Sequence, residues 1–144
     1  MFRVYDFEPE HICPLIVQPM NKELADWYEN GTAEKLKKKT KAFTGAIGDE
    51  IMICFGAMPL WKKRGALWTI LSQNIRKHSV AVYRGLRQAI EEQPWFDRIE
   101  MDVPIDLKIA HKRARFMGFE LECARARKFS PEGEDRALYA WVRS

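Results

Sequence analysis

The chain has 144 residues, a formal net charge of +4 and a pI near 9.0, and 47% of its residues are hydrophobic. This length suits one domain, and the hydrophobic fraction is enough to fill one core, which excludes a disordered chain. The small basic excess fits an anionic partner, but it does not choose among the phosphates of a cofactor, a nucleic acid and an acidic protein surface.

The first third of the chain predicts one strand followed by short helices. Phe2–Phe7 alternates between apolar and polar side chains, as a half-buried strand does. A helix is expected from Pro9, which the first helical turn tolerates, to the residue before Pro19, and a second helix over Lys22–Glu29. A third helix over Ala33–Ala42 carries five lysines. We expect these lysines to form a solvated face, with an electrostatic contact surface as the alternative.

The middle of the chain has the pattern of strands. Gly45 and Gly48-Asp49 are typical of hairpin turns. Ile51–Phe55 is apolar at every position, which favours a central strand covered on both faces. A further strand is expected over Ala66–Leu71, and the polar, basic stretch Ser72–Ser79 that follows is expected to be a loop.

Two amphipathic helices are predicted in the second half of the chain. The first begins at Ser79, an expected N-cap, and its apolar stripe consists of Val80, Tyr83, Leu86 and Ile90. The second begins at Asp106, also an expected N-cap, and ends at Gly118. Its inner stripe consists of Leu107, Ala110, Ala114 and Met117.

Strands lie on both sides of the second helix. Arg98–Val103 alternates cleanly between apolar and charged residues, and a closing hairpin pairs Phe119–Phe129 with Arg136–Arg143. The complete order is strand, helices, three strands, helix, strand, helix and hairpin. An α/β domain with a mixed sheet and helices on both faces buries these patterns best.

This order resembles the GNAT fold of acetyltransferases. The most specific local match is the helix that ends in Gly118-Phe119 and leads directly into a strand. The resemblance implies a single GNAT-like domain over residues 1–144, with a mixed, mainly antiparallel central sheet and helices on both faces.

Three features are similar to those of a small group of GNAT-like proteins from short-tailed bacteriophages. They are the aromatic and apolar strand Leu67–Leu71, the basic loop Arg76-Lys77-His78 and the helix end Gly118-Phe119. Some members of that group are acetyltransferases and others are internal virion proteins. The resemblance therefore implies phage structural proteins as partners, and the virion or the host cytoplasm as the location.

GNAT enzymes hold the diphosphate of acetyl-CoA in a glycine-containing loop between the fourth strand and the following helix, where backbone N–H groups approach the phosphates. The matching stretch Asn74–Ala81 contains no glycine. Either side-chain charges hold the phosphates, or the pocket is lost and the loop serves another partner. In the first case the resemblance implies cofactor contacts from Leu71, Ser72, Arg76, Lys77, His78 and Ser79.

The position of the usual catalytic acid also departs from the family pattern. GNAT enzymes often carry a Tyr four residues before the Gly of Gly-Phe, and its hydroxyl can protonate the leaving thiolate. Ala114 stands at that position, and Leu107 stands where an Asn is common. The hydrophobic framework is kept while these groups are replaced, so no catalytic residue is predicted and the fold is expected to serve as a scaffold.

Other chemistry finds little support in the sequence. His11, His78 and His111 are far apart and form no metal-binding motif, so no metal site is expected. The three cysteines form no CxxC motif, which favours a reducing compartment. No apolar run approaches the ~20 residues of a membrane span, so a soluble protein is expected.

These features lead to three hypotheses. The leading one is a bacteriophage GNAT-fold protein with a degenerate acyl-CoA site, which binds no cofactor and acts by protein contact in the virion or its assembly. The alternative is an acyl-CoA-dependent N-acetyltransferase that uses acetyl-CoA, so whether the chain is an enzyme stays open. A second alternative is a nucleic-acid-binding module formed by Arg125, Arg127 and the lysines of Lys35–Lys41. The oligomeric state does not follow from the sequence.

Overall fold

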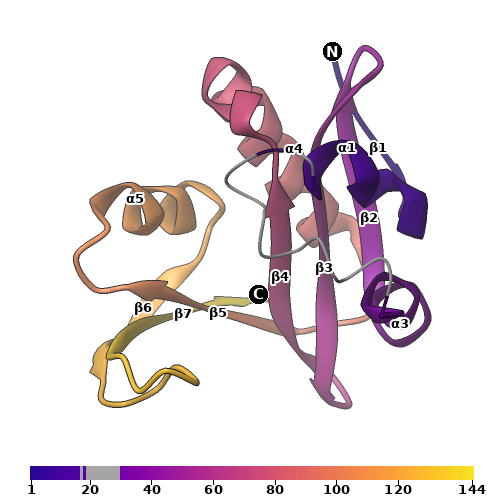
Figure 1. The fold of residues 1–144 in the computed structure, drawn as a ribbon. Coiled ribbons are helices and arrows are strands. Elements are labelled where there is room, and N and C mark those ends of the chain that lie inside the picture. The colour runs from indigo at the N-terminus through magenta and orange to yellow at the C-terminus, as the bar shows by residue number, and fades with distance from the viewer. Residues whose placement is uncertain (17, 19–29) are drawn as a thin grey trace.

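A seven-stranded sheet forms the centre of the computed structural model, which describes residues 1–16, 18 and 30–144 (Figure 1). Its strands are β1 (Phe2–Asp6), β2 (Lys41–Ile47), β3 (Glu50–Trp61), β4 (Arg64–Leu71), β5 (Arg98–Pro104), β6 (Glu120–Ala126) and β7 (Arg136–Val142). The helical elements are η1 (Pro9–Ile12), α1 (Cys13–Ile16), α3 (Thr32–Lys39), η3 (Gln73–His78), α4 (Ser79–Glu92) and α5 (Lys108–Phe116), of which η1 and η3 are 3₁₀-helices.

The strand order is β1-β2-β3-β4-β5-β7-β6, and every neighbouring pair is antiparallel except β4 and β5. The parallel β4–β5 ladder joins only Arg64–Ala66 to Arg98–Glu100. Beyond Ala66 the two strands part, and Figure 1 shows β5 running across the direction of β4. The expectation of a mixed, mainly antiparallel sheet is confirmed, and the separation of β4 from β5 creates the opening described below.

Helices cover the sheet on both faces. The larger buried cluster joins α4 and α5 to one face, and the smaller one joins η1, α1 and α3 to the other. Successive residues of β3 enter different clusters: Ile53 and Phe55 pack toward α4, while Cys54 packs among the residues of the smaller cluster. This alternation explains why the strand is apolar at both parities.

The ring of Phe2 anchors β1 between β2 and α4. A Cβ atom added at Gly45 of β2 would lie 2.2 Å from Cζ of this ring, and one added at Gly85 of α4 would lie 2.2 Å from its Cδ2. The two glycines therefore leave the space that the aromatic ring fills. The expectation that Gly45 marks a turn is wrong, because Gly45 lies inside β2, next to an irregularity in the register with β3.

Several helix boundaries differ from the expectation. The lysine-rich helix ends at Lys39, and Lys41 already begins β2. Asp106 does not cap α5, whose N-cap is Leu107, and no side-chain hydrogen bond caps this helix. Leu107 and Val80 were expected in apolar stripes, yet their side chains are exposed. The expected helix Lys22–Glu29 lies outside the described residues.

Burial makes Cys54 an unreactive thiol. The side chain is fully buried, and this burial raises the pKa of the Cys54 thiol to about 12. Because the thiolate is the reactive form, we expect two of the three thiols, those of the half-buried Cys13 and Cys123, to react with an aromatic disulfide reagent in the native protein. Cys54 should react only after denaturation. Equal rates for all three thiols under native conditions would contradict the buried position of Cys54.

Candidate functional site

A cleft opens where β4 and β5 part, and we call it the β4–β5 cleft. It holds a cavity of about 220 Å³. Two strands and two helices form its walls, through Leu67, Thr69 and Leu71 of β4, Met101, Asp102, Val103 and Pro104 of β5, Tyr83 of α4, and Ala110 and Arg113 of α5, with Met117 just beyond α5. The walls are mostly apolar, which suits an extended organic chain better than a free ion.

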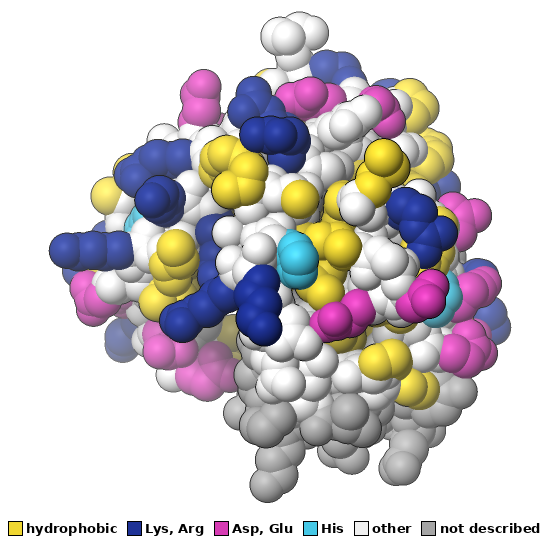
Figure 2. All heavy atoms as spheres, turned by 90° about the horizontal axis from the view of Figure 1, so that it is seen from above, with side chains coloured by type: hydrophobic (Ala, Val, Ile, Leu, Met, Phe, Trp, Pro, Cys, Tyr) yellow, Lys and Arg dark blue, Asp and Glu magenta, His cyan; other side chains and the backbone are white. Residues whose placement is uncertain are grey.

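A second hollow, the α4–α5 groove, lies between the two helices and has a volume of about 480 Å³. Its apolar lining comes from Val80, Ile109 and Phe116, all exposed, and its charge comes from Arg76, Lys112 and Arg113. Tyr83 and Arg113 line both hollows, so the groove and the cleft adjoin at these two side chains. Figure 2 looks down on this end of the molecule, where Lys and Arg side chains lie beside hydrophobic ones.

The three cations of the α4–α5 groove have no carboxylate partner in the described part of the chain. Other arginines are paired: Arg64 and Arg98 both bind Glu100, and Arg136 donates to Asp102 over 2.8 Å. Unpaired cations around an apolar hollow create a positive potential that favours an anionic ligand. The groove is therefore suited to a molecule that is both anionic and partly apolar.

Tyr83 is the buried polar group at the place where the two hollows adjoin. Its side chain is 5% exposed, and its hydroxyl has no hydrogen-bond partner among the described residues. The guanidinium carbon of Arg113 lies 5.5 Å from the centre of its ring. Burial raises the pKa of Tyr83, although the charge of Arg113 opposes this effect. The hydroxyl therefore stays protonated at neutral pH and can donate a hydrogen bond.

The structure brings together three of the six residues that the resemblance assigned to cofactor binding. Leu71 lines the cleft, and Arg76 and Ser79 line the groove. Lys77 and His78 are exposed and do not contribute to the lining of either hollow.

The hydroxyl of Ser72 forms a hydrogen bond with the nearby backbone. Ser72 is fully buried, and its hydroxyl accepts a hydrogen bond from the N–H of Asn74 over 3.1 Å and lies 3.5 Å from the side-chain amide nitrogen of Gln18. The carbonyl oxygen of the Gln18 side chain also accepts the N–H of Gln73. These contacts fix the start of η3.

The glycine-free stretch after β4 is ordered as a helix, where an open loop was expected. Gln73–His78 forms the 3₁₀-helix η3, which leads into α4 at Ser79. Ser79 was expected to cap α4, but the N-cap position is taken by His78, and no side-chain hydrogen bond caps the helix. Ala114, at the position of the usual acid, is fully buried and has no hydroxyl to offer.

Two histidines have structural partners. The ring of His111 contacts the carbonyl oxygens of Pro104 and Ile105 through Nε2 and the hydroxyl of Tyr139 through Nδ1, at 2.6 Å. Nε2 therefore donates to the carbonyls, and Nδ1 lies within hydrogen-bond distance of the hydroxyl of Tyr139. His11 accepts from the N–H of Glu8 over 3.0 Å. No group of metal-binding side chains exists among the described residues.

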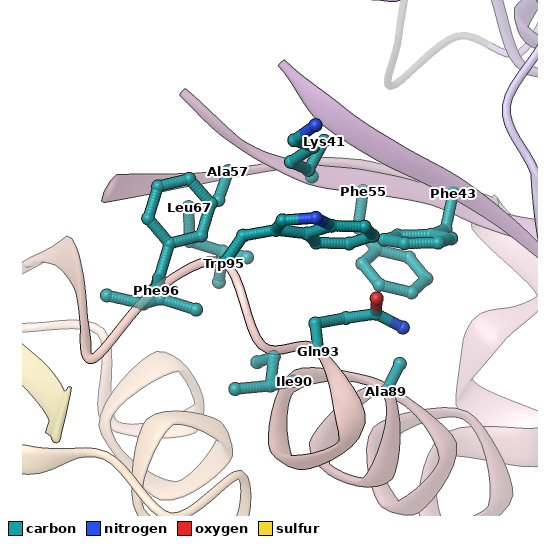
Figure 3. A pocket seen from close by; sticks show the side chains of 12 residues that line it. Lys41, Phe43, Phe55, Ala57, Leu67, Ala89, Ile90, Gln93, Trp95 and Phe96 are labelled. Carbon is teal, nitrogen blue, oxygen red and sulfur yellow. The ribbon is translucent and has the colours of Figure 1, made fainter. Parts of the chain in front are cut away.

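A third hollow lies beside Trp95 and is too small for a substrate. Figure 3 shows the indole of Trp95 lying along the ring of Phe43, with Lys41 above it. The ring centres of Trp95 and Phe43 are 6.1 Å apart, and Nζ of Lys41 lies 4.8 Å from the centre of the Trp95 ring. The remaining volume is about 30 Å³, room for about two water molecules. We therefore interpret this hollow as a packing defect of the core.

The basic residues expected to bind nucleic acid do not form one surface. Lys35–Lys39 belong to α3, which packs beside β2, whereas Arg125 lies on β6 at the opposite edge of the sheet (Figure 1). Arg125 is also paired with Asp135 over 2.8 Å. No helix in the described part of the chain is both long and apolar enough to cross a membrane.

Comparisons with known proteins identify the fold. No protein-family model and no curated protein matches the sequence. Among solved structures, an acetyltransferase of the GNAT family from Streptococcus pneumoniae aligns over 100% of both chains, with a TM-score of 0.72 and 11% identity. The enzyme AAC(6')-Ib, solved with paromomycin and acetyl-CoA, aligns over 99% of this chain and 93% of its own, with a TM-score of 0.73 and 12% identity.

A third similar structure is RimL, a ribosomal-protein α-N-acetyltransferase solved in complex with coenzyme A. It aligns over 99% of this chain and 94% of its own, with a TM-score of 0.74 and 11% identity. The chain therefore has the GNAT fold, as the order of its elements indicated. Nothing in these comparisons supports the expected resemblance to phage virion proteins.

Proposed function

We propose that this GNAT-fold chain binds an acyl-CoA and transfers its acyl group to an amine. The observation that carries the proposal is the set of three cations in the α4–α5 groove, which have no carboxylate partner among the described residues and lie directly beside the β4–β5 cleft. The similar structures AAC(6')-Ib and RimL were solved with acetyl-CoA and coenzyme A, which supports the same class of ligand here.

The residues present fit coenzyme A. Arg76, Lys112 and Arg113 would hold its phosphates through side-chain charge, which takes over the role of backbone N–H groups in a glycine-rich loop. The mostly apolar β4–β5 cleft, walled by Leu67 and Met101 among others, would take the pantetheine arm. The expectation that no cofactor binds came from the missing glycines, but the cations of α5 offer the phosphates a different set of donors.

When bound, an acyl-CoA supplies an activated acyl group that passes to an amine nitrogen with release of the thiol. The chain contributes binding and orientation, because the walls of the cleft hold the ligand between two strands and shield it from water. Asp102 of β5 lies in the wall of the cleft and pairs with Arg136. Arg136, and Arg113 of the same lining, balance the charge of this carboxylate, so the cleft does not select the amine by net charge.

Calorimetric titration tests the binding step, and detection of released thiol tests the transfer. We expect saturable binding of acetyl-CoA with a dissociation constant in the micromolar range, and thiol release that depends on an added amine. Free inorganic phosphate should compete poorly, because it cannot occupy the cleft. A protein that is folded by circular dichroism yet binds no acetyl-CoA at millimolar concentration would refute the proposal.

A second candidate function is contact with another protein without acyl transfer, which was the leading hypothesis from the sequence. The observation on its side is the ordered helix η3 in place of an open phosphate loop, together with the buried Ala114 at the position of the usual acid. Phage structural proteins would be the partners in this case. The same titration separates the two candidates, since this second function predicts no specific binding of acetyl-CoA.

A further inference from the structure

We propose that the hydroxyl of Tyr83 is a hydrogen-bond donor kept for a carbonyl oxygen of the ligand chain in the β4–β5 cleft, namely an amide or thioester carbonyl of the acylated pantetheine arm. This inference rests on the proposed function and adds a residue to it. It assigns a ligand contact to α4, whereas the usual acid of the fold would come from the position of Ala114 on α5.

The first support is the state of the hydroxyl itself. Buried hydroxyl groups nearly always have a hydrogen-bond partner, because burial without one costs free energy. Tyr83 is 5% exposed, and its hydroxyl is the buried side-chain oxygen that lacks a partner among the described residues. A Phe at this position would fill the same space without that cost, so the hydroxyl needs a partner that the described residues do not supply.

The second support is the position of the side chain. Tyr83 lines both the cleft and the groove, so a ligand that runs from one into the other must pass it. The neighbouring cation Arg113 also lines both hollows. The phosphates of the ligand would lie on the side of the groove and its acylated end on the side of the cleft, which brings the amide-containing arm past the hydroxyl.

Tyr139 offers a matched comparison within the same domain. It is also a buried tyrosine, 1% exposed, but its hydroxyl contacts Nδ1 of His111 at 2.6 Å. Removing that hydroxyl leaves a part-buried imidazole nitrogen without its hydrogen-bond partner, whereas removing the hydroxyl of Tyr83 breaks no bond within the described residues. Replacement of Tyr by Phe should therefore lower the stability of the protein at position 139 but not at position 83.

The experiment compares Tyr83→Phe with Tyr139→Phe in the full chain. Unfolding by urea gives the stability of each unliganded variant, and calorimetric titration with CoA and acetyl-CoA gives the affinity. We expect Tyr83→Phe to be as stable as the parent protein or more stable, and to bind CoA about three- to tenfold more weakly, as expected for one lost hydrogen bond. Tyr139→Phe should be less stable but bind CoA with nearly the parent affinity.

Each other outcome overturns a different statement. If Tyr83→Phe loses as much stability as Tyr139→Phe, the hydroxyl has a structural role and the inference fails. If the parent protein binds CoA and acetyl-CoA and Tyr83→Phe binds both equally well, the inference fails while the proposed function stands. If the parent protein binds neither CoA nor acetyl-CoA, the proposed function fails and this inference falls with it.

Discussion

The double substitution Arg76→Glu and Lys112→Glu is expected to weaken CoA binding by about 100-fold or more. Both cations line the α4–α5 groove, and neither has a carboxylate partner in the described part of the chain. A charge-assisted hydrogen bond contributes ~1.5–3 kcal/mol, and each tenfold change in affinity corresponds to about 1.4 kcal/mol. Calorimetric titration at about 0.15 M salt, where exposed charges beyond ~8 Å are screened, measures the effect.

Lys77→Glu is the matched control for this charge reversal. The family resemblance implied that Lys77 would bind phosphate together with Arg76 if the cofactor site is kept, but the structure leaves Lys77 exposed and outside the lining of the groove. We expect this variant to bind CoA with little change. Dephospho-CoA provides a second control, because removal of one phosphate should reduce the penalty of the double substitution. A loss in Lys77→Glu as large as that in the double variant would place the phosphates beside Lys77, outside the groove, and contradict the assignment to the groove.

Gly85→Ala should destabilise the protein by about 1–3 kcal/mol, although the same change inside a helix normally stabilises it by ~1 kcal/mol. The reversal comes from the ring of Phe2, whose Cδ2 would lie 2.2 Å from the new methyl carbon. No conformation of the native packing accepts such a contact, so β1 or α4 must shift. Urea denaturation monitored by tryptophan fluorescence measures the change in the free energy of unfolding.

A double-mutant cycle with Phe2→Ala isolates this contact. Phe2→Ala alone should also destabilise the protein, because it removes a ring packed against the core. In the Phe2→Ala background, Gly85→Ala should become neutral or stabilising, since the methyl group then enters vacated space and improves the helix propensity. If Gly85→Ala destabilises both backgrounds equally, the ring of Phe2 is not the cause.

Much of the fold could be predicted because its strands and helices have regular patterns. The alternation of Ile99, Met101 and Val103 identified β5, and the fully apolar run of β3 indicated a strand covered on both faces, as the structure confirms. The first residues of helices were predicted less well where the prediction rested on a single capping residue. Asp106 and Ser79 are good capping residues by type, yet neither occupies the N-cap position, which Leu107 takes in α5 and His78 takes in α4.

The candidate site was harder to predict, because a helical period cannot distinguish a core position from the wall of a hollow. Val80 and Tyr83 belong to one apolar stripe, but Val80 lines an open groove and Tyr83 separates two hollows. Lys112 and Arg113 lie far along the chain from Arg76 and approach it only through the packing of α5 beside α4. A signal was present in retrospect: a tyrosine within an otherwise aliphatic stripe places a hydroxyl among apolar side chains, where it needs a polar partner.

The brief pairing of β4 with β5 has a mechanical consequence. Three residue pairs, aided by the N–H groups of Asp97 and Arg98 that bind the carbonyl oxygen of Lys63, join two sub-sheets that are each held by long antiparallel ladders. The β4–β5 ladder is the shortest in the sheet, although one buried cluster spans it and contains both Ile53 of β3 and Ile99 of β5. A ligand in the cleft, such as the proposed acyl-CoA, would therefore contact the sheet where the fewest ladder hydrogen bonds oppose a change in the spacing of two strands, while side-chain packing across the shared cluster opposes their separation.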